Sequence, residues 1–228
     1  MEGVGRYVEL MISMFRSLFS WHKYLSLTVD HMYNIGVLSI PIVILTSLFS
    51  GMVTSVQAAY QFESGFVPNW FVGSIVGESV LLELAPMMTA LVMTGRIGAT
   101  IAAEIGTMRV TEQIDALKSL STDPYEYLVL PRVMAGIITL PLLIFFADII
   151  GIMGGWFIAT QSLDFNGDVY LQNTESFLEI SDITSGLIKA SIFGLIITLM
   201  GCYNGFYSSG GAQGVGSATT NAVVSSSI

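Results

Sequence analysis

The chain has 228 residues, of which 53% are hydrophobic and only 11% are charged, with a net charge of −9. A soluble domain carries about 25% charged residues, and its surface must be covered by polar groups. The composition therefore disfavours a soluble enzyme, a nucleic-acid-binding protein and a disordered chain. It predicts an all-α integral membrane protein that forms a single domain over residues 1–228. The single cysteine, Cys202, excludes an intrachain disulfide and a multi-cysteine metal site.

The first predicted element, at residues 4–27, is an amphipathic helix. Polar residues recur there at steps of three and four, and apolar residues fill the positions between them. This spacing favours a helix that lies in the membrane interface, and the alternative is an ordinary surface helix. The polar residues are Arg6, Glu9, Ser13, Arg16, Ser17 and Ser20.

Four apolar segments are predicted to span the membrane: 35–59, 70–95, 133–160 and 183–206. The first has no charge over its whole length, which at ~1.5 Å per residue is ~37 Å of helix. Pro86 lies inside the second span and leaves the backbone carbonyl of Leu82 without its helical donor. The glycine-rich, uncharged tail after the fourth span ends where another helix could begin.

The basic residues indicate the orientation of the spans. Seven of the eight lie before the first span or around the 96–131 loop, and the two opposite connectors contain none. The positive-inside rule therefore places the N-terminus, this loop and the tail in the cytoplasm. The acidic 161–182 connector then faces outward. The seven residues are Arg6, Arg16, Lys23, Arg96, Arg109, Lys118 and Arg132.

Four ionisable residues fall inside predicted spans: Glu78, Glu83, Asp148 and Lys189. A charge at the bilayer centre costs ~2.5–3.5 kcal/mol, so each should face protein or water. Glu83 and Lys189 either line a polar cavity or form a buried pair that holds two helices together. For Glu78 and Asp148 a structural role, or a position that reaches the interface, is the preferred interpretation.

Glycine spacing predicts close helix contacts. Gly-x-x-x-Gly occurs at 73–77, 151–155 and 201–205, in three separate spans, and this pattern lets backbones approach closely. The sequence contains no phosphate-binding loop of the G-x-x-x-x-G-K-[ST] type. It also shows no credible nucleophile–base arrangement, metal site or cofactor site, so we expect that the chain is not an enzyme by itself.

The cytoplasmic segment 97–120 has no proline and is predicted to be helical. Glu104, Met108, Thr111 and Asp115 align on it at steps of four and three. It is either a helix that receives force from a soluble motor or one that merely packs on the bundle. After it, Asp123 can cap a new helix that has Pro124 at its first position.

Three blocks carry a resemblance to a known family. They read LLELAP at 81–86, GRIGATIAAEIG at 95–106 and MRVTEQIDAL at 108–117, and the tail at 211–224 continues the pattern. Together they resemble the MlaE (YrbE) permeases, the membrane subunits of ABC transporters that work with MCE-domain proteins. The resemblance runs from about residue 30 to the end of the chain.

The resemblance implies a homodimeric permease of the bacterial inner membrane that moves phospholipid or a related lipid. An ATPase subunit would dock on the 104–118 helix, and a lipid-binding MCE-domain protein would sit on the outer face. Glu83, Leu82 and Lys189 match positions that line the lipid cavity. The implied ATPase-coupling residues are Glu104, Met108, Arg109, Glu112 and Asp115.

The chain departs from the family pattern at several points. Leu82, Ser217 and Asn221 stand where relatives can have arginine, and the family has a fifth span beyond the 228 residues given. Two other functions remain open. One is an ion-coupled secondary transporter that uses Glu83, Asp148 and Lys189, and the other is a membrane scaffold without transport activity.

Overall fold

The computed structural model describes residues 2–62 and 71–228, and within these ranges it contains helices and no strand. Four helical runs are long and apolar enough to cross a membrane: Trp21–Phe62, Val72–Val110, Tyr125–Ser162 and Ile180–Phe206. This confirms the prediction of an all-α membrane protein. Most of the predicted connector between the first two spans, residues 63–70, lies outside the described residues.

The N-terminal segment is not one continuous α-helix. Helix α1 (Glu2–Ser17) is followed by a 3₁₀ segment, η1 (Leu18–Tyr24), and then by α2 (Leu25–Ile35), η2 (Val37–Ser39) and α3 (Ile40–Phe62). Helix α1 buries Leu10 and Met14 and exposes Val8 and Ile12. Most of the predicted polar face lies outside the described side chains, so its position in the membrane interface stays a prediction.

The second run consists of α4 (Val72–Ser79), η4 (Val80–Leu84), α5 (Ala85–Met93), η5 (Thr94–Gly98) and α6 (Ala99–Val110). The segments η4 and η5 are single π-helical turns. Helix α6 thus extends the second span, and a separate short helix, α7 (Gln113–Ser119), follows it.

The prediction that 104–118 is one helix is therefore wrong. Glu112 adopts a left-handed conformation with φ 59°, which breaks the helix because such a residue cannot continue a right-handed one. The Thr111 hydroxyl also donates to the Thr107 carbonyl at 2.8 Å, competing with regular helix geometry. The predicted face that joins Met108 to Asp115 consequently ends at Thr111.

The third run begins as predicted. The Asp123 carboxylate accepts a hydrogen bond from the Tyr125 backbone N–H at 2.9 Å, before the π-helical η6 (Tyr125–Val129) and the long α8 (Leu130–Ser162). Helix α9 (Gly167–Phe177) forms within the acidic connector, where the Asn166 side chain caps it by accepting from Asp168 N. Helix α10 (Ile180–Phe206) is the fourth run, and the glycine-rich tail itself forms α11 (Gly211–Ser227).

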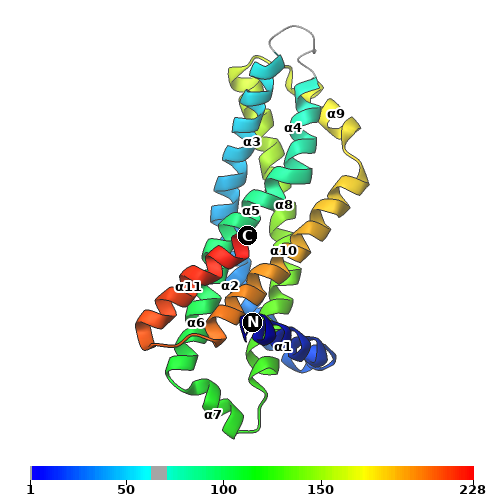
Figure 1. Cartoon of the computed structure of the whole chain (residues 1–228). Coiled ribbons are helices and arrows are strands. Elements are labelled where there is room, and N and C mark those ends of the chain that lie inside the picture. Colours follow the sequence, from blue (N-terminus) through cyan, green and yellow to red (C-terminus); the bar gives the residue numbers. More distant parts are fainter. Residues whose placement is uncertain (1, 63–70) are drawn as a thin grey trace. The chain divides into compact units, whose positions relative to one another are not determined.

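The chain divides into two compact units. The first comprises residues 1–38, 91–139 and 191–228, and the second comprises residues 39–90 and 140–190. Within the first unit, α11 packs along α6, and within the second, α4 packs against α9 and α3 (Figure 1). Whether the whole chain behaves as a single domain stays a prediction.

The predicted small-residue contacts are confirmed within the chain. A methyl group on Gly73 would lie 2.8 Å from the Tyr170 carbonyl of α9, and one on Gly205 would lie 2.9 Å from the Ala102 carbonyl. A methyl group on Gly51 would overlap the carbonyl of Gly151, the first glycine of the 151–155 motif. These glycines therefore let helix backbones meet directly, as in other membrane bundles.

Candidate functional site

The backbone carbonyl of Leu82 and the Lys189 ammonium form the centre of the site in the second unit. Pro86 cannot donate to this carbonyl, because proline has no N–H. The Lys189 ammonium, from α10, donates to it instead at 2.8 Å. The turn around it is π-helical, with the Ala85 N–H bonded to the Val80 carbonyl. A lysine from a distant helix thus replaces the donor that Pro86 removes.

Glu83 follows Leu82 in the chain, and its side chain is exposed. Among the described residues, Glu83 and Lys189 form no ion pair with each other, so the proposed buried pair is not what the structure shows. Lys189 is also exposed in the single chain, whereas Leu82 is half-buried. Glu83 and Lys189 thus present an anionic and a cationic group on the surfaces of two largely apolar helical runs, Val72–Val110 and Ile180–Phe206.

The other two charges in the spans differ from this pair. Glu78 is exposed. Asp148 is buried, and its Oδ1 atom has no hydrogen-bond partner among the described residues. Asp148 therefore does not reach the surface of the chain, and the structure does not bring it into the Leu82–Lys189 contact.

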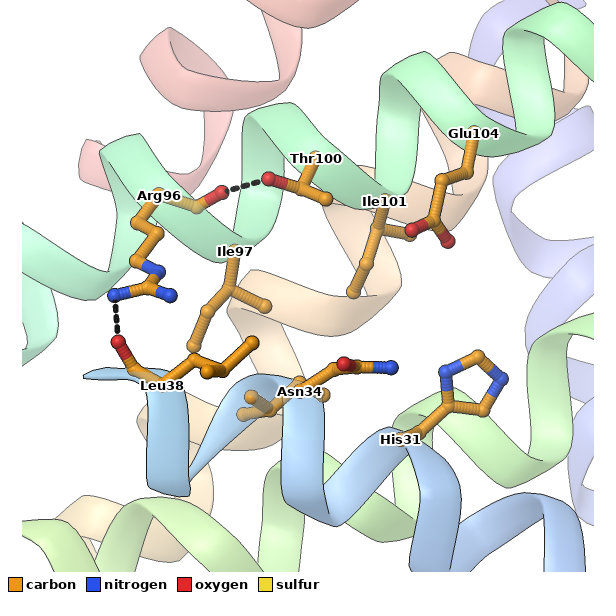
Figure 2. Close-up of a pocket in the computed structure, with 9 residues that line it drawn as sticks. His31, Asn34, Leu38, Arg96, Ile97, Thr100, Ile101 and Glu104 are labelled. Atoms are coloured by element: carbon orange, nitrogen blue, oxygen red, sulfur yellow. Dashed lines mark hydrogen bonds between the residues drawn. The ribbon is translucent and has the colours of Figure 1, made fainter. Parts of the chain in front are cut away.

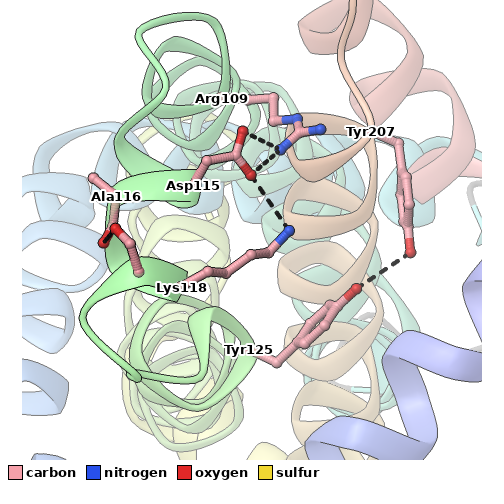
Figure 3. A network of polar contacts seen from close by, with 7 residues as sticks. Arg109, Asp115, Ala116, Lys118, Tyr125 and Tyr207 are labelled. Atoms are coloured by element: carbon pink, nitrogen blue, oxygen red, sulfur yellow. Dashed lines mark hydrogen bonds and ion pairs between the residues drawn. The ribbon is translucent and has the colours of Figure 1, made fainter.

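The predicted ATPase-coupling residues separate into two groups. Three polar side chains at the end of α6 and on α7 form an exposed cluster (Figure 3). The Arg109 guanidinium lies 3.1 Å from the Asp115 carboxylate, and the Lys118 ammonium lies 3.4 Å from it. Glu112 is exposed at the break between the two helices, and Met108 is half-buried on α6.

Glu104 belongs elsewhere in the first unit. Its carboxylate lies 3.2 Å from the guanidinium of Arg132, on α8, and Arg132 also donates to the Leu128 carbonyl at 2.8 Å. The Arg132 side chain is only 7% exposed, whereas that of Glu104 is 50% exposed. Sequence reasoning missed this pair because it treated Arg132 only as an orientation signal.

Glu104 also lines a pocket of about 210 Å³ in the first unit (Figure 2). Its polar wall is made by His31 and Asn34 of α2, Arg96 of η5, and Thr100 and Glu104 of α6. The Arg96 guanidinium donates to the Leu38 carbonyl at the rim. The sequence did contain a signal for this pocket, because the spacing of GRIGATIAAE places Arg96, Thr100 and Glu104 on one helical face. It could not show that α2 covers that face.

Comparison with known proteins agrees with these features. Residues 28–228 match the family model described as Permease MlaE. A "Probable ABC transporter permease protein" of Rickettsia prowazekii is 52% identical over 100% of this chain and 87% of its own length. A protein of the same description from Synechocystis is 42% identical over 87% of this chain and 75% of its own length. The Arabidopsis thaliana protein TRIGALACTOSYLDIACYLGLYCEROL 1, chloroplastic, is 32% identical over 96% of this chain and 61% of its own length.

The four apolar helical runs in the described part of the chain are those of a multi-pass membrane protein. Because the family model covers most of the chain and the relatives match it along its length, the chain belongs to the MlaE permease family.

Proposed function

We propose that this chain is the membrane subunit of an ABC transporter that moves phospholipid or a related lipid, while a separate subunit hydrolyses ATP. One observation carries the proposal: Glu83 and Lys189 are exposed on the second unit, within helical runs that are otherwise suited to lipid. Amphiphilic cargo needs a polar group for its headgroup inside an apolar path. The family and the relatives named as ABC transporter permeases support the same function.

The exposure of these two charges also supports a homodimer. A charge that faced hydrocarbon would cost ~2.5–3.5 kcal/mol, so a second copy is the simplest cover for this face. Two copies would then enclose a cavity lined by Glu83, Leu82 and Lys189 from both chains. In this arrangement Leu82 contributes apolar surface where relatives can supply an arginine.

The exposed end of α6 and helix α7 form the proposed docking surface for the ATPase subunit. The cluster of Arg109, Asp115 and Lys118 fixes α7 against the end of α6, so a push on α7 would reach the second span through a continuous helix. Glu112 and Met108 lie at the junction. Glu104 contributes through its bond to Arg132, which ties the same helix to α8.

The orientation follows from the positive residues. The N-terminus and α7 would face the cytoplasm, and α9 would face the opposite side, where an MCE-domain lipid-binding protein would bind. The bacterial inner membrane fits this topology. The name of the Arabidopsis relative contains that of a galactolipid, which supports lipid as the cargo class.

The test of transport uses proteoliposomes that hold the permease and its ATPase subunit, with a fluorescent phospholipid as the cargo. ATP should drive lipid transfer, and Glu83→Leu and Lys189→Met should each reduce it. Lys23→Gln, which removes an exposed lysine outside the predicted cavity, should leave it unchanged. Transfer driven by an ion gradient without ATP, and lost in Asp148→Asn, would instead establish the ion-coupled alternative. Absence of ATP-driven transfer by the wild-type protein would favour the scaffold, and wild-type transfer rates in both cavity variants would contradict the cavity roles of Glu83 and Lys189.

Docking is tested separately by co-purification. Ala116 is exposed on α7, so Ala116→Trp should block the ATPase subunit by steric overlap without disturbing the packed face of the helix. Gln172→Trp, at an exposed position on α9, is the matched control. Retention of the ATPase subunit by Ala116→Trp would contradict the docking proposal.

A further inference from the structure

The pocket on the first unit has opposite charges at its two ends. Figure 2 shows the Arg96 guanidinium at one end, with the Glu104 carboxylate and the His31 ring at the other. Arg96 and Glu104 are eight residues apart, which corresponds to ~12 Å of helix axis. A ligand that fits this pocket should therefore carry a negative group and a positive group joined by a short tether.

Both charged groups retain capacity for a ligand. A guanidinium has five N–H donors, and within the described part of the chain Arg96 has one acceptor, the Leu38 carbonyl. Glu104 uses Oε2 for Arg132, which leaves Oε1 as an acceptor. A plain anion would meet the Glu104 carboxylate, and a plain cation would meet Arg96, so the pocket suits a zwitterion better than either.

The size of the pocket limits the ligand. A volume of about 210 Å³ is below the ~300–1,000 Å³ of a typical drug-sized site. It can hold a phospholipid headgroup but not the acyl chains. The floor is apolar, formed by the buried side chains of Ile97 and Ile101.

The place of the pocket in the chain fits such a headgroup. Its walls come from residues just before the first predicted span and just after the second, which is the level where headgroups lie in a bilayer. Leu38, which is exposed at the rim, continues the apolar surface toward the spans. Acyl chains could therefore extend along the protein while the headgroup occupies the pocket.

We infer that this pocket binds a zwitterionic phosphate ester, with the phosphate on Arg96 and a primary ammonium on Glu104. The ligand class covers an aminophospholipid headgroup and its free, water-soluble counterpart. The site is distinct from the Glu83–Lys189 surface, since those residues belong to the other unit. As a loading site for cargo it rests on the proposed function, but the binding itself does not.

The chain offers a matched pair of positions for a labelling test. Thr100 lines the pocket and Thr107 lies two turns further along α6, outside it. Both side chains are exposed, and each hydroxyl donates to the carbonyl four residues earlier, at 2.6 and 2.7 Å. The only native cysteine, Cys202, is fully buried, so maleimide should react with an introduced cysteine alone.

The experiment measures the maleimide labelling rate of Thr100→Cys and Thr107→Cys in the full chain, reconstituted in nanodiscs. The discs contain phosphatidylcholine with either phosphatidylethanolamine or phosphatidylglycerol. Phosphatidylethanolamine should slow labelling of Thr100→Cys about fivefold once it exceeds its Kd about fourfold, and should leave Thr107→Cys unchanged. Arg96→Gln and Glu104→Gln should each abolish the protection, whereas Arg96→Lys and Glu104→Asp, which keep the charges, should retain part of it.

Soluble phosphoethanolamine in phosphatidylglycerol discs distinguishes the two sources of the ligand. Protection by the soluble compound assigns the pocket to the headgroup alone, and protection only by the lipid assigns it to the membrane-bound form. Equal labelling in both kinds of disc, or protection that persists in Arg96→Gln, would overturn the inference. If phosphatidylethanolamine does not protect Thr100→Cys in the otherwise unchanged chain while ATP-driven lipid transfer is intact, this site alone is overturned. Protection of Thr100→Cys without any lipid transfer would overturn only the proposed function.

Discussion

The ion pair between Glu104 and Arg132 permits a quantitative prediction. Breaking a fully buried pair by removing one partner costs ~3–5 kcal/mol, whereas an exposed pair contributes ~0.2–1 kcal/mol. Here the Arg132 side chain is 7% exposed and that of Glu104 is 50% exposed. The loss in the free energy of unfolding caused by Glu104→Ala should therefore fall between these limits, at about 2 kcal/mol. The cost arises because the buried guanidinium then keeps, among the residues that the structure describes, only the Leu128 carbonyl as a partner.

The measurement is thermal unfolding of the purified full chain in detergent. A fluorogenic maleimide can report it, because Cys202 is the only cysteine and is fully buried. For a chain of this length ~2–4 °C of Tm corresponds to 1 kcal/mol, so Glu104→Ala should lower Tm by about 4–8 °C. Asp115→Ala, which removes two exposed ion pairs, is the control. At ~0.5 kcal/mol for each exposed pair it should lower Tm by about 2–4 °C.

A double-mutant cycle decides whether the buried charge is the cause. Arg132→Met removes the charge and keeps an apolar side chain that can fill much of the same space. In that background Glu104→Ala should cost less than about 0.5 kcal/mol, because no buried charge is left unpaired. A shift in Tm of the same size in both backgrounds would refute the reasoning, and so would a shift below about 1 °C in the wild-type background.

Three further predictions use the same unfolding assay. Lys189→Met should lower the free energy of unfolding by about 1.5–3 kcal/mol, the contribution of a hydrogen bond to a charged group. The loss should be much smaller in a Pro86→Ala background, because the Leu82 carbonyl regains a backbone donor there. Equal losses in both backgrounds would contradict this. Gly51→Ala should destabilise the protein by about 1–3 kcal/mol, because the added methyl group overlaps a neighbouring backbone. Gly95→Ala, whose methyl group meets open space, should be neutral or stabilising by up to about 1 kcal/mol. Similar effects of the two changes would be inconsistent with the packing. Glu112→Gly should stabilise by about 0.5–1 kcal/mol, because glycine accepts the left-handed conformation, and a loss of stability would show that the Glu112 side chain contributes more than its backbone strain costs.

Much of the fold could be predicted because membrane spans leave a strong local signal. Length and apolarity alone identify four helical runs in the described residues. The Gly-x-x-x-Gly motifs identify several helix contacts, but the tightest ones involve Gly51, Gly136 and Gly194, which lie outside these motifs. The break at Glu112 was not predictable, because glutamate is an ordinary helix residue and its left-handed conformation follows from the helix end around it. Likewise, α11 forms in a glycine-rich segment with poor helix propensity, and its packing on α6 stabilises the helix instead.

The site was predictable in its residues but not in its pairings. The sequence singled out Glu83 and Lys189 because charges are rare in spans, but it could not determine that Lys189 bonds to a backbone carbonyl instead of the carboxylate. It also grouped Glu104 with Asp115 by helical spacing. The pairing of Glu104 with Arg132 joins residues on separate helices, and no local pattern encodes such a contact.

Pro86 and Lys189 together explain why an apolar span can hold a lysine in a fixed place. A proline in a helix removes one hydrogen bond and leaves a carbonyl without a donor, and in a membrane that carbonyl must find another partner. The Lys189 ammonium satisfies it at 2.8 Å, so the proline creates the acceptor that positions the lysine against the η4 turn. An ammonium has three donors, and the carbonyl occupies one of them. The helix therefore stays intact while the ammonium keeps capacity for further hydrogen bonds, and in the function proposed above that capacity would serve an anionic headgroup.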